Sequence, residues 1–171
     1  MRLDAGAARR LFAGSAVARL ATVTPAGRPH IVPVTFVLDS QPGQGDWVYT
    51  AVDHKPKSTE RLQRLRNIQA HPRVALLADH YVDDWTRLWW VRADGEAAVL
   101  DAPAPATGAA DAAGAAEAVQ VAEAAGPLGL LAARYPQYAD QPPAGPVIVV
   151  RVDRWTGWAA AAGERTAGGR S

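Results

Sequence analysis

The stretch ARLATVTPAGRPHIVPV, residues 18–34, has the pattern of a β-hairpin. Its two arms are rich in apolar and β-branched residues, and Thr-Pro-Ala-Gly lies between them at residues 24–27. Proline at the second turn position and glycine at the fourth are typical of a tight turn. We therefore predict strands at Val17–Thr24 and His30–Leu38. Pro33 lacks the N–H that a sheet ladder needs, so it indicates an edge, a bulge or a ligand at that point.

The residue patterns on either side of the hairpin predict a small, mainly β protein. Four further strands are expected, and helices flank them; the fifth strand of the chain is expected to break near Asp94-Gly95. The strands are Trp47–Val52, Arg73–Tyr81, Leu88–Leu100 and Val147–Asp153, and the helices are Leu3–Gly14, Thr59–Gln69 and Leu128–Arg134. Six short strands without βαβ alternation favour an antiparallel barrel over a parallel sheet. No GxGxxG or GxxxxGK[ST] is present, which argues against dinucleotide-binding and P-loop folds.

Length and composition limit the possible classes of protein. The 171 residues suit a single domain over residues 1–160, with an alanine-rich insertion or spacer at 101–126 and a flexible tail at 161–171. Prolines and glycines in the spacer confine any helix there to about residues 115–125. The absence of cysteine excludes disulfides, thiolate metal sites and iron–sulfur clusters. A net charge of +1 argues against a nucleic-acid binder. With no targeting or membrane segment recognised, we expect a cytoplasmic protein.

A basic loop is the sharpest local feature. Both lysines of the protein, Lys55 and Lys57, lie in it two positions apart. Ser58 or Thr59 is placed to cap the helix that follows, whose first turns carry Arg61 and Arg64. Lysines, a capping hydroxyl and a helix N-terminus together form a phosphate-binding arrangement. A solvated basic loop is the alternative, and the sequence leaves both open.

Aromatic residues gather in the second half of the chain, while no catalytic set is apparent. Trp85 and Trp158 are expected at a ligand or an interface, and Trp90 in core or dimer packing. There is no HExxH or GxSxG sequence, and Asp79-His80 with Asp83-Asp84 fits a polar turn better than a metal site. This pattern favours a protein whose bound cofactor supplies the reactivity.

Residues 18–34 resemble the opening hairpin of the pyridoxamine 5'-phosphate oxidase-like split β-barrels. The stretch 55–72, a basic loop and a helix ending in Arg-Asn-Ile, and the HPRVALL that begins at residue 71 resemble the same family. The run DWTRLWWVR, residues 84–92, is similar to the branch of probable F420-dependent enzymes. The resemblance implies a six-stranded antiparallel split barrel of the FMN-binding type.

The resemblance further implies a homodimer that binds a flavin or deazaflavin in clefts between the subunits. The phosphate would be held by the basic loop, the chain of the cofactor by the end of the third strand, and the ring by the second strand, while the partner subunit adds aromatic and basic side chains. The phosphate residues are Lys55, Lys57 and Ser58, with Pro56 in the same loop and Arg61 beyond it toward an acidic tail, and the residues along the cofactor chain are Thr50 and Ala51. The ring would lie along the backbone around Val32, Pro33 and Val34, and the partner subunit would add Trp85, Arg87 and Trp158.

The expected function is hydride transfer from reduced coenzyme F420 to a small unsaturated or quinone-like substrate. Arg61 and Arg64 favour F420 because its oligoglutamate tail is acidic, although exposed helix arginines are an equally simple interpretation. An FMN enzyme on the same fold, a non-catalytic flavin- or F420-binding protein and, more remotely, a haem-degrading barrel are the alternatives. No nucleic acid, membrane or metal is expected among its ligands.

Overall fold

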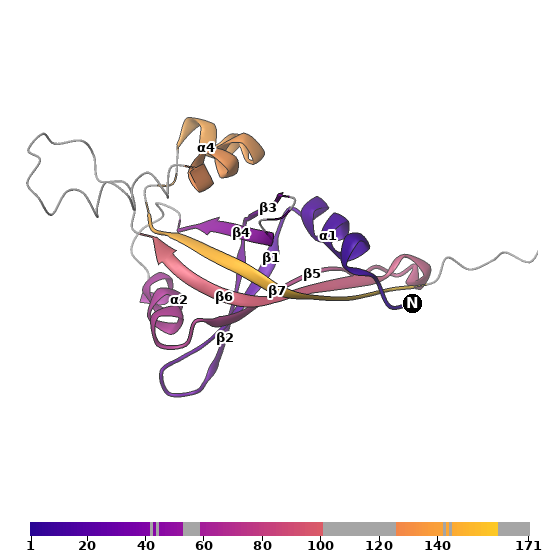
Figure 1. Ribbon diagram of the computed structural model, residues 1–171, viewed down its shortest axis with the longest axis horizontal. Coiled ribbons are helices and arrows are strands. Elements are labelled where there is room, and N and C mark those ends of the chain that lie inside the picture. Colours follow the sequence, from indigo (N-terminus) through magenta and orange to yellow (C-terminus); the bar gives the residue numbers. More distant parts are fainter. Residues whose placement is uncertain are drawn as a thin grey trace, which may run out of the picture.

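The computed structural model describes residues 1–41, 43, 45–52, 59–100, 126–141, 143 and 145–160. Within them, seven strands form one antiparallel sheet in the order β2-β1-β5-β6-β7-β4-β3 (Figure 1). The strands are β1 Ala18–Val23, β2 Pro29–Val34, β3 Val37–Gln41, β4 Gly45–Ala51, β5 Arg73–His80, β6 Trp89–Leu100 and β7 Val147–Ala159. The helices are α1 Ala5–Gly14, α2 Thr59–Ala70, the 3-10 turn η1 Trp85–Arg87, a helical stretch at 126–134, and α4 Pro136–Asp140.

The predicted hairpin is confirmed, but the prediction that its second arm is a single strand is wrong. Residues 29–34 form β2 and residues 37–41 form β3, and these strands lie at opposite ends of the sheet order. Only Thr35 and Phe36 join them, so the chain passes directly from one sheet edge to the other. This link folds the sheet into a split barrel and makes the strand count seven rather than six. Pro33 keeps its place opposite Arg19 on the edge strand β2, where a missing N–H is tolerated.

A tyrosine hydroxyl bridges the split. The Tyr135 Oη accepts a hydrogen bond from the Phe36 N–H at 3.0 Å and lies 2.7 Å from the Phe36 carbonyl oxygen. It also lies 2.9 Å from the Ala16 carbonyl oxygen, so its single proton faces two acceptors. Beside it, the Thr35 and Tyr138 hydroxyls are hydrogen-bonded at 2.9 Å. The Tyr135 hydroxyl thus satisfies backbone groups that would be left unpaired where the ladder stops.

Other elements differ from the sequence prediction mainly in length. The segment 39–46, expected as a loop, largely belongs to the β3–β4 hairpin, and β7 continues through Trp155 and Trp158 to Ala159. The helix α4 was not predicted. The break expected near Asp94-Gly95 is confirmed as a register shift against β7. The predicted helix at 115–125, most of the alanine-rich segment and the tail lie outside the described residues.

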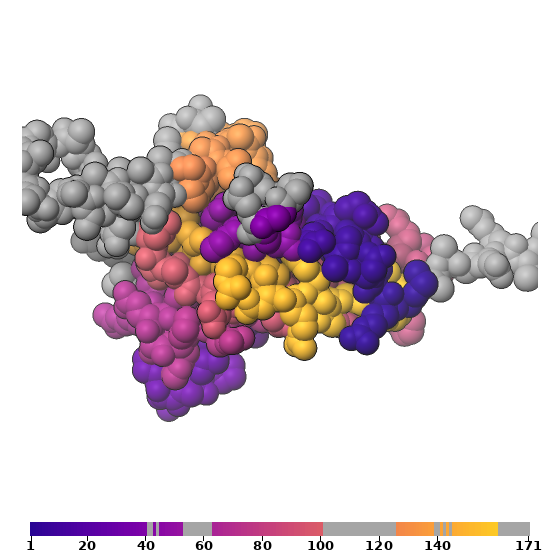
Figure 2. Space-filling model, in the orientation of Figure 1, coloured from indigo at the N-terminus to yellow at the C-terminus, as the bar shows by residue number. Residues whose placement is uncertain are grey.

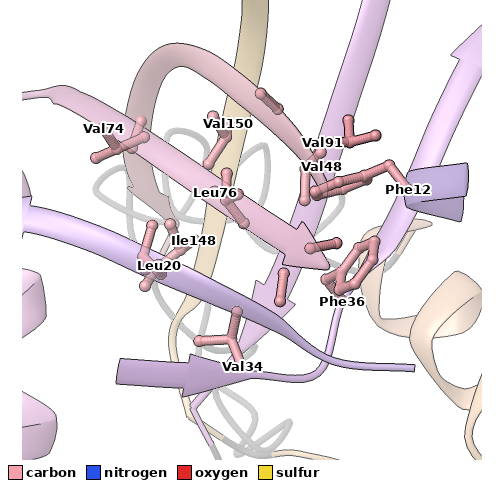
Figure 3. Close-up of a cluster of buried hydrophobic side chains, with 14 of the residues drawn as sticks. Phe12, Leu20, Val34, Phe36, Val48, Val74, Leu76, Val91, Ile148 and Val150 are labelled. Atoms are coloured by element: carbon pink, nitrogen blue, oxygen red, sulfur yellow. The ribbon is translucent and has the colours of Figure 1, made fainter. Parts of the chain in front are cut away.

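The interior of the barrel is apolar and holds α1 in place. Figure 3 shows Leu20, Leu76, Val91 and Ile148 pointing toward one another from four strands. Phe12 of α1 completes this core, with its ring 4.5 Å from that of Phe36 and 5.2 Å from that of Trp155. Burying each such side chain contributes about 1.5–3 kcal/mol. No helix in the described residues is long and apolar enough to cross a membrane.

A buried carboxylate ties α1 to the sheet. Asp46 of β4 accepts hydrogen bonds from Arg9 Nε at 2.5 Å, Ser40 Oγ at 2.6 Å and Trp155 Nε1 at 2.6 Å. Burial raises the pKa of Asp46, but these hydrogen bonds and the charge of Arg9 outweigh it, so the pKa lies below its ordinary value. The ionised form is therefore the one that the fold stabilises.

Candidate functional site

The end of β4 is held tightly where the basic loop begins. Thr50 and Ala51 are buried, and Ala51 packs in a second small core with Leu131 and Tyr138. The next residue, Val52, donates its backbone N–H to the Pro146 carbonyl at 3.0 Å. Because their side chains point into the protein, Thr50 and Ala51 can meet a ligand only through their backbone. Lys55, Pro56, Lys57 and Ser58 lie outside the described residues.

The helix after the loop is fixed to the sheet by a buried polar chain. Fully buried Asn67 donates from Nδ2 to Thr22 Oγ1 at 2.8 Å, and Gln63 Nε2 donates to Asn67 Oδ1 at 2.7 Å. Thr22 in turn faces His30 of β2 at 3.4 Å. Thus α2, which carries Arg61 in its first turn, cannot slide without breaking these bonds. The Arg61 side chain lies outside the described part of the chain.

The three predicted ring-lining residues occupy the end of β2 with different exposure. Val34 is buried in the main core and Val32 packs against it, whereas Pro33 points outward to solvent. Since Val37, at the start of β3, pairs with Tyr49 of β4, the end of β2 comes close to the end of β4 across the split. The structure therefore brings the β2 residues toward Thr50 and Ala51.

An apolar hollow lies at the other end of the sheet. It has a volume of about 550 Å³ and is lined, among the described residues, by Tyr81, Val82, Asp83, Trp85, Leu88 and Trp158. Trp85 is 77% exposed, Tyr81 65% and Trp158 37%. Exposed apolar side chains that cluster in this way mark sites for a ligand or a partner.

Short-range hydrogen bonds fix the wall of this hollow. Asp84 caps η1 by accepting from Thr86 N at 3.1 Å and Thr86 Oγ1 at 2.6 Å, and these bonds, above all the one from the hydroxyl, lower its pKa. Opposite η1, the N-terminal segment pairs with β7 through a bridge between Arg2 and Trp158. Figure 2 shows this segment and α1, in indigo, lying beside β7. Arg87 follows in η1 and is exposed.

The fold can be compared with known proteins. The chain matches the pyridoxamine 5'-phosphate oxidase family over residues 5–159, which is most of its length. The chain belongs to this family. No curated protein matches it by sequence.

Solved structures of this split-barrel type share its fold at low identity. A conserved hypothetical protein from Mycobacterium tuberculosis is 17% identical, with 94% of this chain and 87% of that chain covered and a TM-score of 0.61. A FAD-binding protein from Mesorhizobium loti is 16% identical, with 92% and 95% covered and a TM-score of 0.57. A FAD-binding protein from Mycobacterium smegmatis is 18% identical, with 92% and 97% covered and a TM-score of 0.52.

Within one chain of this oxidase-family fold, the predicted site residues form two separate groups. Ala51 pairs with Val147 at one end of β7, and Trp158 lies eleven residues later on the same strand. At a rise of about 3.3 Å per residue, the stretch of β7 between these two positions is about 36 Å long. Figure 1 shows α2 and the end of β4 on the left, and the turn before β6 at the right. In a single copy these two groups therefore lie toward opposite ends of β7.

Tyr81, Val82, Asp83 and Leu88 were not predicted as site residues. The sequence signal for them was an apolar pair, Tyr-Val, directly before two acidic residues in a strand connection, which by itself indicates only a turn. No three His, Asp or Glu side chains gather into a possible metal site in the part of the chain that the structure describes.

Proposed function

We propose that this protein is a homodimeric oxidoreductase that uses coenzyme F420, bound between the subunits, to reduce a small unsaturated or quinone-like substrate. When bound, the reduced ring supplies a hydride, which together with one proton from solvent or the protein reduces a C=C or a quinone carbonyl. The protein's own residues bind, orient and shield these groups.

The separation along β7 is the observation that supports a site shared between subunits. The ring and phosphate of F420 or FMN are joined by a five-carbon ribityl chain, which is far shorter than the about 36 Å of β7 that separates the position of Ala51 from Trp158. A twofold dimer can place the Trp158 end of one subunit over the Ala51 end of the other, twice. In this arrangement Trp85, Arg87 and Trp158 reach the cofactor from the partner.

The sequence around the start of α2 fits such a cofactor. The helix α2 starts directly after the two lysines, and its dipole adds positive potential where Lys55, Lys57 and Ser58 would hold the phosphate. Arg61, in the first turn, extends the positive charge toward an acidic tail. The backbone of β2 around Pro33 would then run along the ring.

A second candidate function is flavin binding without turnover. Two of the solved structures with this fold are named FAD-binding proteins, and the described hollow is mainly apolar with no paired acid and base in its lining. FMN or FAD would then replace F420. The identity of the bound cofactor, F420 or a flavin, distinguishes this second function from the first.

The test of the cofactor is a titration of the purified protein with F420, FMN and FAD, followed by tryptophan fluorescence. Tight binding of F420 with weak binding of both flavins supports the proposal, and the reverse order makes the protein a flavoprotein. Oxidation of bound reduced F420 on addition of quinones or enones distinguishes an enzyme from a binding protein. If none of the three binds, the cofactor assignment is wrong.

The test of the shared site is subunit mixing. Lys55→Ala/Lys57→Ala should weaken cofactor binding, as should Trp85→Ala/Trp158→Ala, whereas Arg66→Ala, which removes an exposed charge elsewhere on α2, should not. Refolding the two double variants together should restore about a quarter of the sites, because half of the dimers are hybrids with one intact site each. No recovery, or a monomer in solution, refutes the shared site.

A further inference from the structure

We propose that the apolar hollow beside η1 is the subsite for the substrate ring, and that it selects flat aromatic or quinone-like rings that are neutral or cationic and rejects anionic ones. This deepens the proposed function and depends on it, because the hollow faces a cofactor only across the subunit interface. The hollow itself is described within one chain. Its lining consists of the six residues named above for this hollow.

The size and lining of the hollow indicate a small flat ligand. Its volume of about 550 Å³ lies in the range of about 300–1,000 Å³ that is usual for small-molecule sites. Tyr81, Trp85 and Trp158 offer three aromatic side chains, and Val82 and Leu88 add aliphatic surface. Aromatic faces stack on planar rings in offset or edge-on geometry.

The exposure of these side chains argues that the surface is kept for binding. Trp85, at 77% exposed, is the most exposed large apolar side chain of the described chain, and three more of the exposed ones line the same hollow. Placing four such residues together in water has no benefit for the stability of a single chain. The cap of Asp84 on η1 keeps Trp85 on a defined turn, so the wall is formed before a ligand arrives.

Charge decides which rings the hollow accepts. Asp83 is the one charged residue among the six that line it. The next residue, Asp84, adds a second carboxylate whose pKa is lowered and which therefore stays ionised. Carboxylates beside aromatic faces attract a cation, both through charge and through cation–π contact, and repel an anion. Arg87 lies outside the lining, but its positive charge acts on Asp84 and offsets part of that carboxylate's charge, so the negative charge at the hollow itself rests on Asp83.

The position of the hollow also separates it from the phosphate end of the cofactor. The anionic phosphate is assigned to the basic loop, which begins about 36 Å from Trp158 along β7. The hollow and the basic loop thus differ in charge as well as in position. A ring enclosed between the hollow of one subunit and the cofactor ring of the other would meet apolar surface on both faces.

The experiment uses three acridines of one shape and different charge, without cofactor. Proflavine is a cation, acridine is neutral at pH 8, and acridine-9-carboxylate is an anion. Proflavine binding is followed by fluorescence anisotropy and the other two by competition. The expected order of affinity is cation, then neutral ring, with the anion weakest. An anion that binds as tightly as the cation overturns the charge assignment.

Two variants locate the binding. Trp85→Ala and Trp158→Ala should each weaken proflavine binding by about five- to a hundredfold, the loss expected for one stacking partner. Leu130→Ala, which removes an exposed apolar side chain on the helical stretch 126–134, is the matched control and should bind as wild type does. Because Trp85 is so exposed, its loss should leave the fold intact, as far-UV circular dichroism checks. Wild-type affinity in both tryptophan variants overturns the site.

A last arm separates the substrate from the cofactor ring. Proflavine binding is repeated with saturating F420 or FMN. Retained binding supports a substrate subsite, whereas displacement means that the hollow holds the cofactor ring and overturns the assignment. The dye arms need no cofactor, so a protein that binds proflavine but neither F420 nor a flavin refutes the proposed function and leaves the hollow as an aromatic site.

Discussion

Removing one hydroxyl at the split of the barrel should destabilise the whole fold. In Tyr135→Phe the ring stays, but the Phe36 N–H loses its acceptor at 3.0 Å, and the carbonyls at 2.7 and 2.9 Å lose their shared donor. Phe36 is fully buried, so water does not readily replace the two bonds to its backbone, whereas the Ala16 carbonyl is exposed and can bind water instead. A lost hydrogen bond contributes about 0.5–1.5 kcal/mol, and an unsatisfied buried group costs about 1–3 kcal/mol. We expect the free energy of unfolding to fall by about 2–3 kcal/mol.

The measurement is urea unfolding followed by tryptophan fluorescence, with thermal unfolding as a second readout. For a chain of this length the same change should lower Tm by about 4–12 °C. Tyr81→Phe is the control, because it removes a hydroxyl from a side chain that is 65% exposed. A loss below about 0.5 kcal/mol in Tyr135→Phe, equal to that of the control, would refute the idea that the hydroxyl replaces the missing ladder.

Three further changes test the packing around the sheet. The pKa of Asp46 is lower in the folded protein than in the unfolded chain, so its contribution to the free energy of unfolding is complete above about pH 4, the pKa of an unfolded aspartate, and is lost as the pH falls through the lower folded value. Asp46→Asn should lower the free energy of unfolding by about 1.5–3 kcal/mol at pH 7 and flatten this pH dependence, as measured by urea unfolding. In Gly95→Ala the new Cβ would lie 2.1 Å from the Arg151 carbonyl oxygen, so stability should fall by at least about 2 kcal/mol, whereas Gly14→Ala meets open space and should be neutral or slightly stabilising in the same assay. Asn67→Ala breaks the bonds from α2 to β1 and should cost about 2–4 kcal/mol in urea and weaken cofactor binding; unchanged affinity would mean that α2 does not position the phosphate loop.

Local sequence patterns were enough to predict most elements. The alternation on either side of Pro25 predicted the first hairpin, and its turn has the expected hydrogen bond from Gly27 N to Thr24 O at 2.8 Å. Helical spacing predicted α2 from Thr59 to within one residue of its end. These features depend on neighbours in the chain, which is why a sequence can reveal them.

The split between β2 and β3 could not be predicted from the sequence. Pro33 drew attention to this strand, but the chain leaves the sheet at Thr35 and Phe36, two ordinary strand residues. The reason is a distant side chain, because Tyr135 reaches back across about 100 positions to hydrogen-bond Phe36. No local propensity records such a partner.

The sequence by itself determined the class of the fold and the absence of thiol chemistry, and it singled out the pair of lysines as the predicted anion site. The tertiary structure decided where these parts lie relative to one another. It buried the side chains of Val34 and Ala51, which leaves their backbone to face a ligand, and it gathered Trp85 and Trp158 with Tyr81 into one hollow. It also put about 36 Å of strand between that hollow and the end of β4. Spacing along the chain fixes the local elements, but the register of β6 on β7 decides which of their ends meet, and register follows from packing across the whole barrel.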